Sequence, residues 1–160
     1  ITRTMELIAT ARFKKAMDRA AAATDYTNRI TSIVTDLAKA GTDVTHPLLQ
    51  PREQVKQAEM LLLTSNRGLC GGYNGAVIRL ALQRRAEILE RTGDLPFNVS
   101  GKRGIAALKF RGVPIEKTFT QFDDEPAFDE VAKIADDLME RFIAGTLDRV
   151  DVVYTRFINA

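Results

Sequence analysis

The stretch 60-MLLLTSNRGLCGGYNGAVIRL-80 decides the fold of this chain. Its first part, residues 60–64, is a compact apolar run that predicts a buried strand. A glycine-rich turn follows over residues 68–75. A helix is then predicted from about Asn74 to Arg91, ending near Gly93. The stretch is therefore a strand, a turn and a helix in succession.

The same unit repeats downstream. A strand is predicted at residues 97–100, a short helix at about 103–110 and a weaker strand at 115–122. Asp124 and Pro126 then open a helix with apolar residues at steps of three and four, and a last strand is predicted at residues 151–158. Strands that alternate with helices predict an α/β fold with a doubly wound, mostly parallel, Rossmann-like sheet.

Upstream of this pattern lies a long helix. Residues 1–39 contain no Gly or Pro, and Gly41 follows where a helix would end. A helix of roughly 40 residues is about 60 Å long, so much of it must project. Its apolar residues follow a narrow coiled-coil seam, which suits a partner helix. The alternative is a long helix packed on its own domain. We therefore expect a projecting helix over residues 1–41 and an α/β domain over residues 42–160.

Composition excludes several classes of protein. The 160 residues include 23 basic and 21 acidic side chains, so the net charge of +2 draws the chain to neither nucleic acid nor membrane. One cysteine and one histidine, Cys70 and His46, cannot form an internal disulfide or a Cys/His zinc site, and a reducing compartment is expected. The longest aliphatic run, residues 60–63, is too short to span a membrane.

The glycine turn leaves alternatives open. Its position after a strand suits a phosphorylated ligand assisted by Arg67, although the turn matches neither G-x-G-x-x-G nor a phosphate loop. A nucleophile elbow centred on Cys70 would need a histidine later in the chain, whereas His46 precedes it. The third interpretation is structural, with the glycines permitting a tight turn and Cys70 packing as a small apolar residue.

Charge is uneven along the first helix. Its first 20 residues carry five basic and two acidic side chains. Such a run is commonly a solvated face, and it is also suited to an acidic partner near the tip. The basic residues are Arg3, Arg12, Lys14, Lys15 and Arg19, and the acidic ones are Glu6 and Asp18.

Two long motifs carry a family resemblance. Residues 1–12, ITRTMELIATAR, and residues 67–74, RGLCGGYN, resemble the gamma subunit of the F-type ATP synthase, in that family's order and separation. His46-Pro47-Leu48 also fits, and the resemblance extends over essentially the whole chain. Because members of the family end in a second long helix, we expect this chain to be an internal portion that lacks it.

The resemblance implies a non-catalytic rotor subunit with no cofactor and no metal. It would turn inside a ring of alpha and beta subunits and rest on the epsilon subunit and the membrane-embedded c ring. It would couple ion flow to conformational change at nucleotide sites on its partners. The location implied is peripheral, on the cytoplasmic face of a bacterial plasma membrane or on the equivalent mitochondrial or thylakoid membrane. A coiled-coil scaffold without a motor remains an alternative.

The resemblance also implies contact residues. Met5 matches a position that faces an acidic loop of beta. Arg67 and Cys70 match a loop that lies against the beta C-terminal domains. Around Met5, the residues expected to share the beta contact are Arg3, Arg12, Lys14 and Lys15. The candidates for contact with the c ring, in the loop after the first helix, are Thr42, Asp43 and Thr45.

Overall fold

The computed structural model describes residues 2–39, 46–122 and 126–156. The chain forms two compact units: one holds the first helix and residues up to Leu49, with Arg156, and the other spans Gln50–Thr155. Each unit is described by itself.

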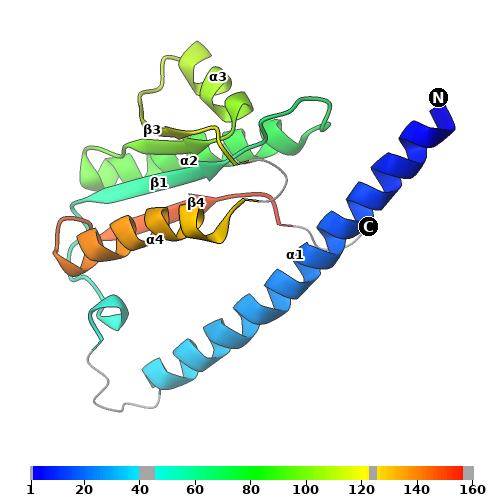
Figure 1. The fold of residues 1–160 in the computed structure, drawn as a ribbon. Helices are drawn as coiled ribbons and strands as arrows, with labels where there is room; N and C mark the ends of the chain where they lie inside the picture. Colours follow the sequence, from blue (N-terminus) through cyan, green and yellow to red (C-terminus); the bar gives the residue numbers. More distant parts are fainter. Residues whose placement is uncertain (1, 40–45, 123–125, 157–160) are drawn as a thin grey trace. The chain divides into compact units, whose positions relative to one another are not determined.

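The first unit is dominated by α1, Thr2–Lys39, a continuous helix that confirms the prediction for residues 1–39 (Figure 1). None of its residues is buried, and large apolar side chains such as Met5 (65% exposed) and Tyr26 (70%) face solvent. A short 3-10 turn, η1, Pro47–Leu49, follows. An amphipathic helix of this length with no buried face lacks the packing that normally stabilises one.

The second unit is built on four parallel strands: β1 (Ala58–Leu63), β2 (Phe97–Ser100), β3 (Ile115–Phe119) and β4 (Arg149–Val153). Their order in the sheet is β3-β2-β1-β4, so the chain starts in the middle and winds outward in both directions. The predicted parallel, doubly wound sheet is confirmed.

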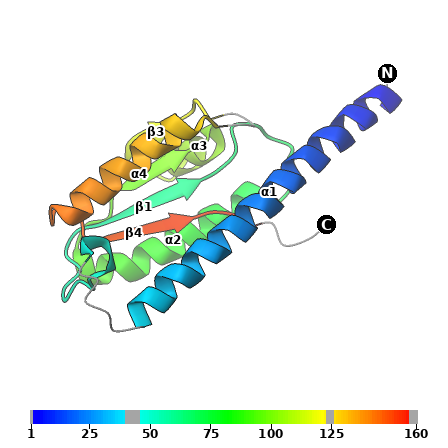
Figure 2. The ribbon, with the colours of Figure 1, turned by 60° about the horizontal axis from the view of Figure 1, so that its bottom comes forward.

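Three helices connect the strands: α2 (Tyr73–Thr92), α3 (Lys102–Phe110) and α4 (Phe128–Ile143). Helices α2 and α3 cover one face of the sheet and α4 covers the other (Figures 1 and 2). Gly93 ends α2 with a φ of 74°, a conformation that glycine adopts without steric cost.

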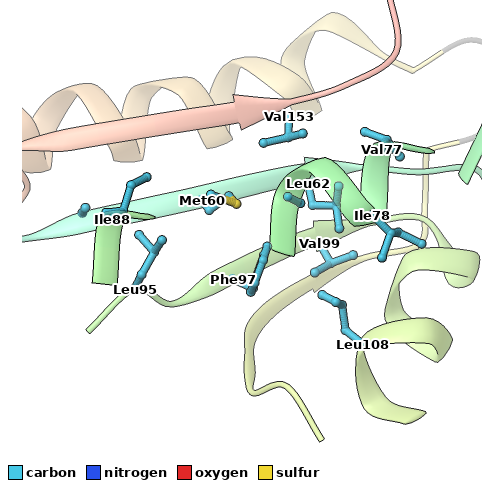
Figure 3. Packing of buried hydrophobic residues seen from close by; sticks show 12 residues of the cluster. Met60, Leu62, Val77, Ile78, Ile88, Leu95, Phe97, Val99, Leu108 and Val153 are labelled. Atoms are coloured by element: carbon cyan, nitrogen blue, oxygen red, sulfur yellow. The ribbon is translucent and has the colours of Figure 1, made fainter. Parts of the chain in front are cut away.

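The hydrophobic core lies between the sheet and α2 with α3 (Figure 3). Alternate residues of β1, Met60 and Leu62, are fully buried there beside Phe97 and Val99 of β2. Ile78 of α2 packs against this layer. The run that predicted the first strand therefore supplies the centre of the core.

Some predicted limits were wrong. β4 covers residues 149–153 rather than 151–158, because Arg149 and Val150 pair with Ala58 and Glu59 of β1 and residues 154–156 are no longer strand. β3 ends at Phe119 rather than at residue 122. Asp124, expected to open the fourth helix, lies outside the described residues, and α4 begins at Phe128.

Ion pairs link helix α4 to its face of the sheet. Arg141 forms an ion pair with Glu59 of β1, whose side chain is only 3% exposed, and Asn98 donates a hydrogen bond of 2.9 Å to the same carboxylate. Lys117 of β3 pairs with Asp137 at 3.0 Å. The hydrogen bond from Lys117 lowers the pKa of Asp137, and the hydrogen bond to Glu59 raises the pKa of Arg141.

Apolar contact on the α4 face is looser than in the core. No residue of α4 is buried, and an apolar cavity of about 430 Å³ lies between the helix and the sheet. Leu61 and Leu63 line the cavity from β1, and Val131 and Leu138 line it from α4. The ion pairs therefore add polar contacts to this loosely packed apolar face.

The Asp148 carboxylate binds the segment that leads into β1. Asp148 Oδ2 accepts hydrogen bonds of 2.9 Å from the backbone N–H groups of Lys56 and Gln57. These bonds, that of Gln57 foremost, lower the pKa of Asp148. In return, the Gln57 carbonyl accepts from the N–H groups of Asp148 and Arg149 at 2.8 and 3.2 Å.

This geometry predicts a pH dependence of stability. The Asp148 pKa is lower in the folded than in the unfolded chain, so its stabilising contribution is present above the unfolded value of about 3.9 and is lost as the pH falls through the folded value. In Asp148→Asn this contribution is absent at every pH. We expect the stability difference between wild type and variant, measured by urea unfolding, to shrink as the pH is lowered from 6 to below about 4. A constant difference would contradict the assignment.

Candidate functional site

The glycine turn connects β1 to α2 at the carboxyl end of the sheet. Asn74, in the first turn of α2, organises it: its Oδ1 accepts from the Ser65 N–H at 3.0 Å, and its Nδ2 donates to Ser65 Oγ at 2.8 Å. The same Nδ2 lies 3.0 Å from the Cys70 Sγ. One amide side chain thus ties both ends of the loop together.

The tip of this loop is turned out into solvent. Leu69 is 109% exposed and adopts a φ of 59°, a conformation that is uncommon for a residue other than glycine. Gly71 also has a positive φ of 56°. Cys70, between them, is a free and exposed thiol. The loop therefore displays an apolar side chain and a thiol on a shaped backbone, which suits contact with another protein.

The first-turn amides of α3 are already occupied. The N–H groups of Lys102, Arg103 and Gly104 donate to Asn66 Oδ1, the Ser65 carbonyl and Thr64 Oγ1, at 3.0, 3.1 and 2.9 Å. Helix N-termini at this edge of a doubly wound sheet are the groups that bind phosphate in nucleotide-binding proteins. Here those of α3 hold the loop after β1, whereas the phosphorylated ligand considered above would bind at the glycine turn before α2, so that alternative stays open.

Nucleophilic chemistry at Cys70 would need a base within hydrogen-bond reach of the thiol. Its hydrogen-bond partners are Asn74 and Ser65, at 3.0 and 3.7 Å, and neither is a base. His46 Nδ1 accepts a hydrogen bond from the Leu48 N–H within its own turn. Among the described residues, no three side chains of His, Cys, Asp or Glu are grouped as metal ligands would be.

The predicted contact residues fall into two sets. Five lie exposed along the first half of α1: Arg3, Met5, Arg12, Lys14 and Lys15. Two lie exposed in the glycine loop of the second unit, Arg67 and Cys70. The remaining candidates, Thr42, Asp43 and Thr45, lie outside the described residues. Helix α1 carries the first set and the glycine loop carries the second.

Sequence reasoning missed Leu69 as a candidate. A leucine between Gly68 and Cys70 gives no sign in the sequence that its backbone is left-handed and its side chain is fully exposed. It also missed the buried Glu59, because one acidic residue before an apolar run reads as the end of a loop.

In the parts of the chain that the structure describes, no helix combines the length and the apolar character needed to cross a bilayer.

Known proteins similar to this chain match most or all of its length. The family model described as ATP synthase matches residues 1–160. The ATP synthase gamma chain of Rhodopirellula baltica is 57% identical over 159 residues, which are 99% of this chain and 54% of that protein. That of Saccharopolyspora erythraea is 41% identical over 151 residues, 94% of this chain and 49% of its own length. The chain thus spans about half the length of the curated relatives it matches.

A solved structure has the same fold. It is the central stalk and c ring of the Tetrahymena thermophila mitochondrial ATP synthase, with a TM-score of 0.68 and 19% sequence identity. The match covers 99% of this chain and 66% of the other. At that identity the likeness concerns the arrangement of helices and strands.

Proposed function

The chain belongs to the gamma-chain family of the ATP synthases, and from this premise we propose that it is a rotor. It is a non-catalytic subunit, in which residues 1–41 contribute to the shaft and residues 42–160 form the foot. Its rotation couples transmembrane ion flow to conformational change at nucleotide sites on partner subunits. The partners are the alpha and beta subunits, the epsilon subunit and the c ring.

The observation that carries the proposal is α1. A 38-residue helix with no buried residue and with large apolar side chains in solvent needs other helices to cover it. A second shaft helix would cover the apolar seam, and the surrounding subunits would meet the remaining face.

The basic end of α1 is the proposed contact with beta. Arg12, Lys14 and Lys15 are exposed and follow one another within a single turn of the helix. They suit an acidic loop, with Arg3 and Met5 extending the contact toward the helix start. Because exposed charge pairs are individually weak, the contact depends on several of them together.

The glycine loop is the second proposed contact with beta. Arg67 and Cys70 lie beside the exposed Leu69, so a cation and an apolar side chain are presented on one turn. The Asn74 hydrogen bonds hold the two ends of this loop together. Thr42, Asp43 and Thr45 remain the proposed contact with the c ring. The assembly is peripheral to the membrane, on its cytoplasmic face in a bacterium.

Reconstitution tests the proposal. Alpha and beta subunits are expressed with and without the full-length version of this chain, and ATP hydrolysis is measured on the purified assemblies. We expect a stable complex whose sustained turnover requires the chain. Failure to associate, with alpha and beta shown to be competent with another gamma subunit, would contradict the proposal.

A charge variant serves as the second arm of this experiment. With Arg12, Lys14 and Lys15 all changed to Ala, we expect the complex to assemble and its rate of ATP synthesis in vesicles to fall several-fold, because the acidic surface of beta loses its counterpart. Synthesis and hydrolysis that are both unchanged would remove the basic end of α1 from the torque-bearing contact.

A further inference from the structure

The two faces of the sheet in the second unit are covered unequally. On β1, Leu62 is fully buried against α2 and α3, whereas Leu61 and Leu63, which point to the opposite face, are only half-buried. On β4, Val153 is buried and its neighbour Val152 is 48% exposed. The face that α4 covers therefore keeps apolar side chains that the helix does not fully enclose.

The cavity between α4 and the sheet lies at the carboxyl end of all four strands. Leu63, Ser100 and Phe119 are the last residues of β1, β2 and β3, and Val152 is the last but one of β4. All four residues line the cavity. Open parallel sheets bind their ligands at this edge. The cavity therefore occupies the position of a ligand site in this type of fold.

Helix α4, which lies along this face of the sheet (Figures 1 and 2), provides the other wall. Val131, Ile134, Ala135 and Leu138 line the cavity from the helix. They stand at positions i, i+3, i+4 and i+7 of a single helix face. The residues of the α4 ion pairs are not among those that line the cavity. The helix therefore contributes an apolar wall.

The chemistry of the lining selects the occupant. Among the described residues that line the cavity, Ser100 is the one with a polar side chain. A charged ligand would lose its hydration there without a counter-charge, and a peptide would bury N–H and C=O groups without partners. Water needs several polar partners, which such a lining does not supply. An uncharged hydrocarbon meets none of these costs.

The size of the cavity also suits a small molecule. Its volume of about 430 Å³ lies within the range of pockets that bind small ligands. It is about three times the volume of an engineered apolar cavity that takes up one benzene molecule. An apolar cavity that stays empty lowers stability in proportion to its volume, and a hydrocarbon that fills it restores the missing contacts.

We propose that the cavity between α4 and the sheet is a binding site for one small uncharged hydrocarbon molecule of roughly ten to sixteen carbons. Phe119 and Phe122, whose ring centroids are 6.2 Å apart, contribute an aromatic part of the wall. The bound molecule packs between the helix and the sheet and reduces the opening of α4. The site is independent of the proposed rotor function, because every residue that lines it belongs to the second unit.

A fluorescence titration of the full-length protein tests the proposal. The probe is N-phenylnaphthylamine, an uncharged aromatic molecule that becomes more fluorescent in apolar surroundings, and decanol is the competitor. Ala135→Phe places a ring in the space that the ligand would fill. Ala86→Phe is the matched control, because Ala86 is an exposed residue of α2 that does not line the cavity.

We expect wild type and Ala86→Phe to bind the probe at one saturable site from which decanol displaces it. Ala135→Phe should weaken this binding by about tenfold or more, since lost burial of two methylene groups of a ligand already has an effect of that size. Equal affinity in Ala135→Phe and wild type would overturn the inference, as would the absence of saturable, decanol-sensitive binding in wild type.

Hydrogen exchange of the wild-type protein tests the same site without a substitution, should Ala135→Phe fail to fold. With decanol present, we expect peptides from α4 to exchange several-fold more slowly, because the ligand bridges the helix and the sheet. Peptides from α2, which packs on the opposite face, should be unchanged. Exchange along α4 that decanol does not slow, or equal slowing of α2 and α4, would overturn the inference.

Discussion

Gly101→Ala is expected to unfold the α/β unit. Gly101, between β2 and α3, has a φ of 99°, and an added Cβ would lie 2.1 Å from the Thr64 carbonyl oxygen. Neither backbone can move away, because the Gly101 N–H donates to Phe119 and the Thr64 N–H donates to Ser100. The steric clash and the backbone strain together should lower the free energy of unfolding by about 4 kcal/mol or more. That is a large part of the stability of a domain.

Gly71→Ala is the matched control for this prediction. Gly71 also has a positive φ, of 56°, but nothing lies within 4 Å of an added Cβ. Only the left-handed backbone is then penalised, by about 1 to 2 kcal/mol. Hydrogen exchange of peptides from β1 and β2 in the full-length protein measures both variants. Equal protection in the two would show that the close approach to Thr64 is not a constraint.

Arg141→Met is expected to have the second largest effect. It leaves the Glu59 carboxylate, which is 3% exposed, with Asn98 as its hydrogen-bond partner and no opposite charge paired with it. Removing one member of a buried ion pair commonly costs about 3 to 5 kcal/mol, because the remaining charge stays desolvated. We expect α4 to detach from the sheet, seen as faster hydrogen exchange along α4.

Two further variants separate charge from packing in this prediction. Glu59→Gln combined with Arg141→Met removes both charges and keeps an acceptor for Asn98, so most of the stability should return. Lys117→Met breaks the ion pair between β3 and Asp137 of α4, in which the two side chains are 42% and 45% exposed. It should lower the free energy of unfolding by less than about 1 kcal/mol. Similar losses in Lys117→Met and Arg141→Met would refute the role of burial.

The parts of the fold that local signals govern were predictable from the sequence. β2 begins and ends at the predicted residues, because its short run is bounded by Pro96 and Gly101. The long helix followed from a segment without glycine or proline. The start of β4 was missed because Arg149 is recruited by pairing with Ala58, and such a register depends on the assembled sheet.

The site was harder to predict than the fold. The capping of α3 by the loop after β1 depends on two segments that meet only at the edge of the folded sheet. Asn66 is a loop residue by composition, and only the structure shows its oxygen on the Lys102 N–H. Burial of Glu59 likewise depends on Arg141, which is distant in the chain.

A reversible cross-link at Cys70 tests the central claim, that this chain rotates against beta, most directly. In the assembled complex, a disulfide is formed between the exposed Cys70 thiol and a cysteine placed on the facing surface of beta, and ATP hydrolysis is followed before and after reduction. The proposed rotor predicts that hydrolysis stops while the bond is present and returns on reduction, with Cys70→Ser unaffected throughout. Full hydrolysis in a completely cross-linked complex would contradict it.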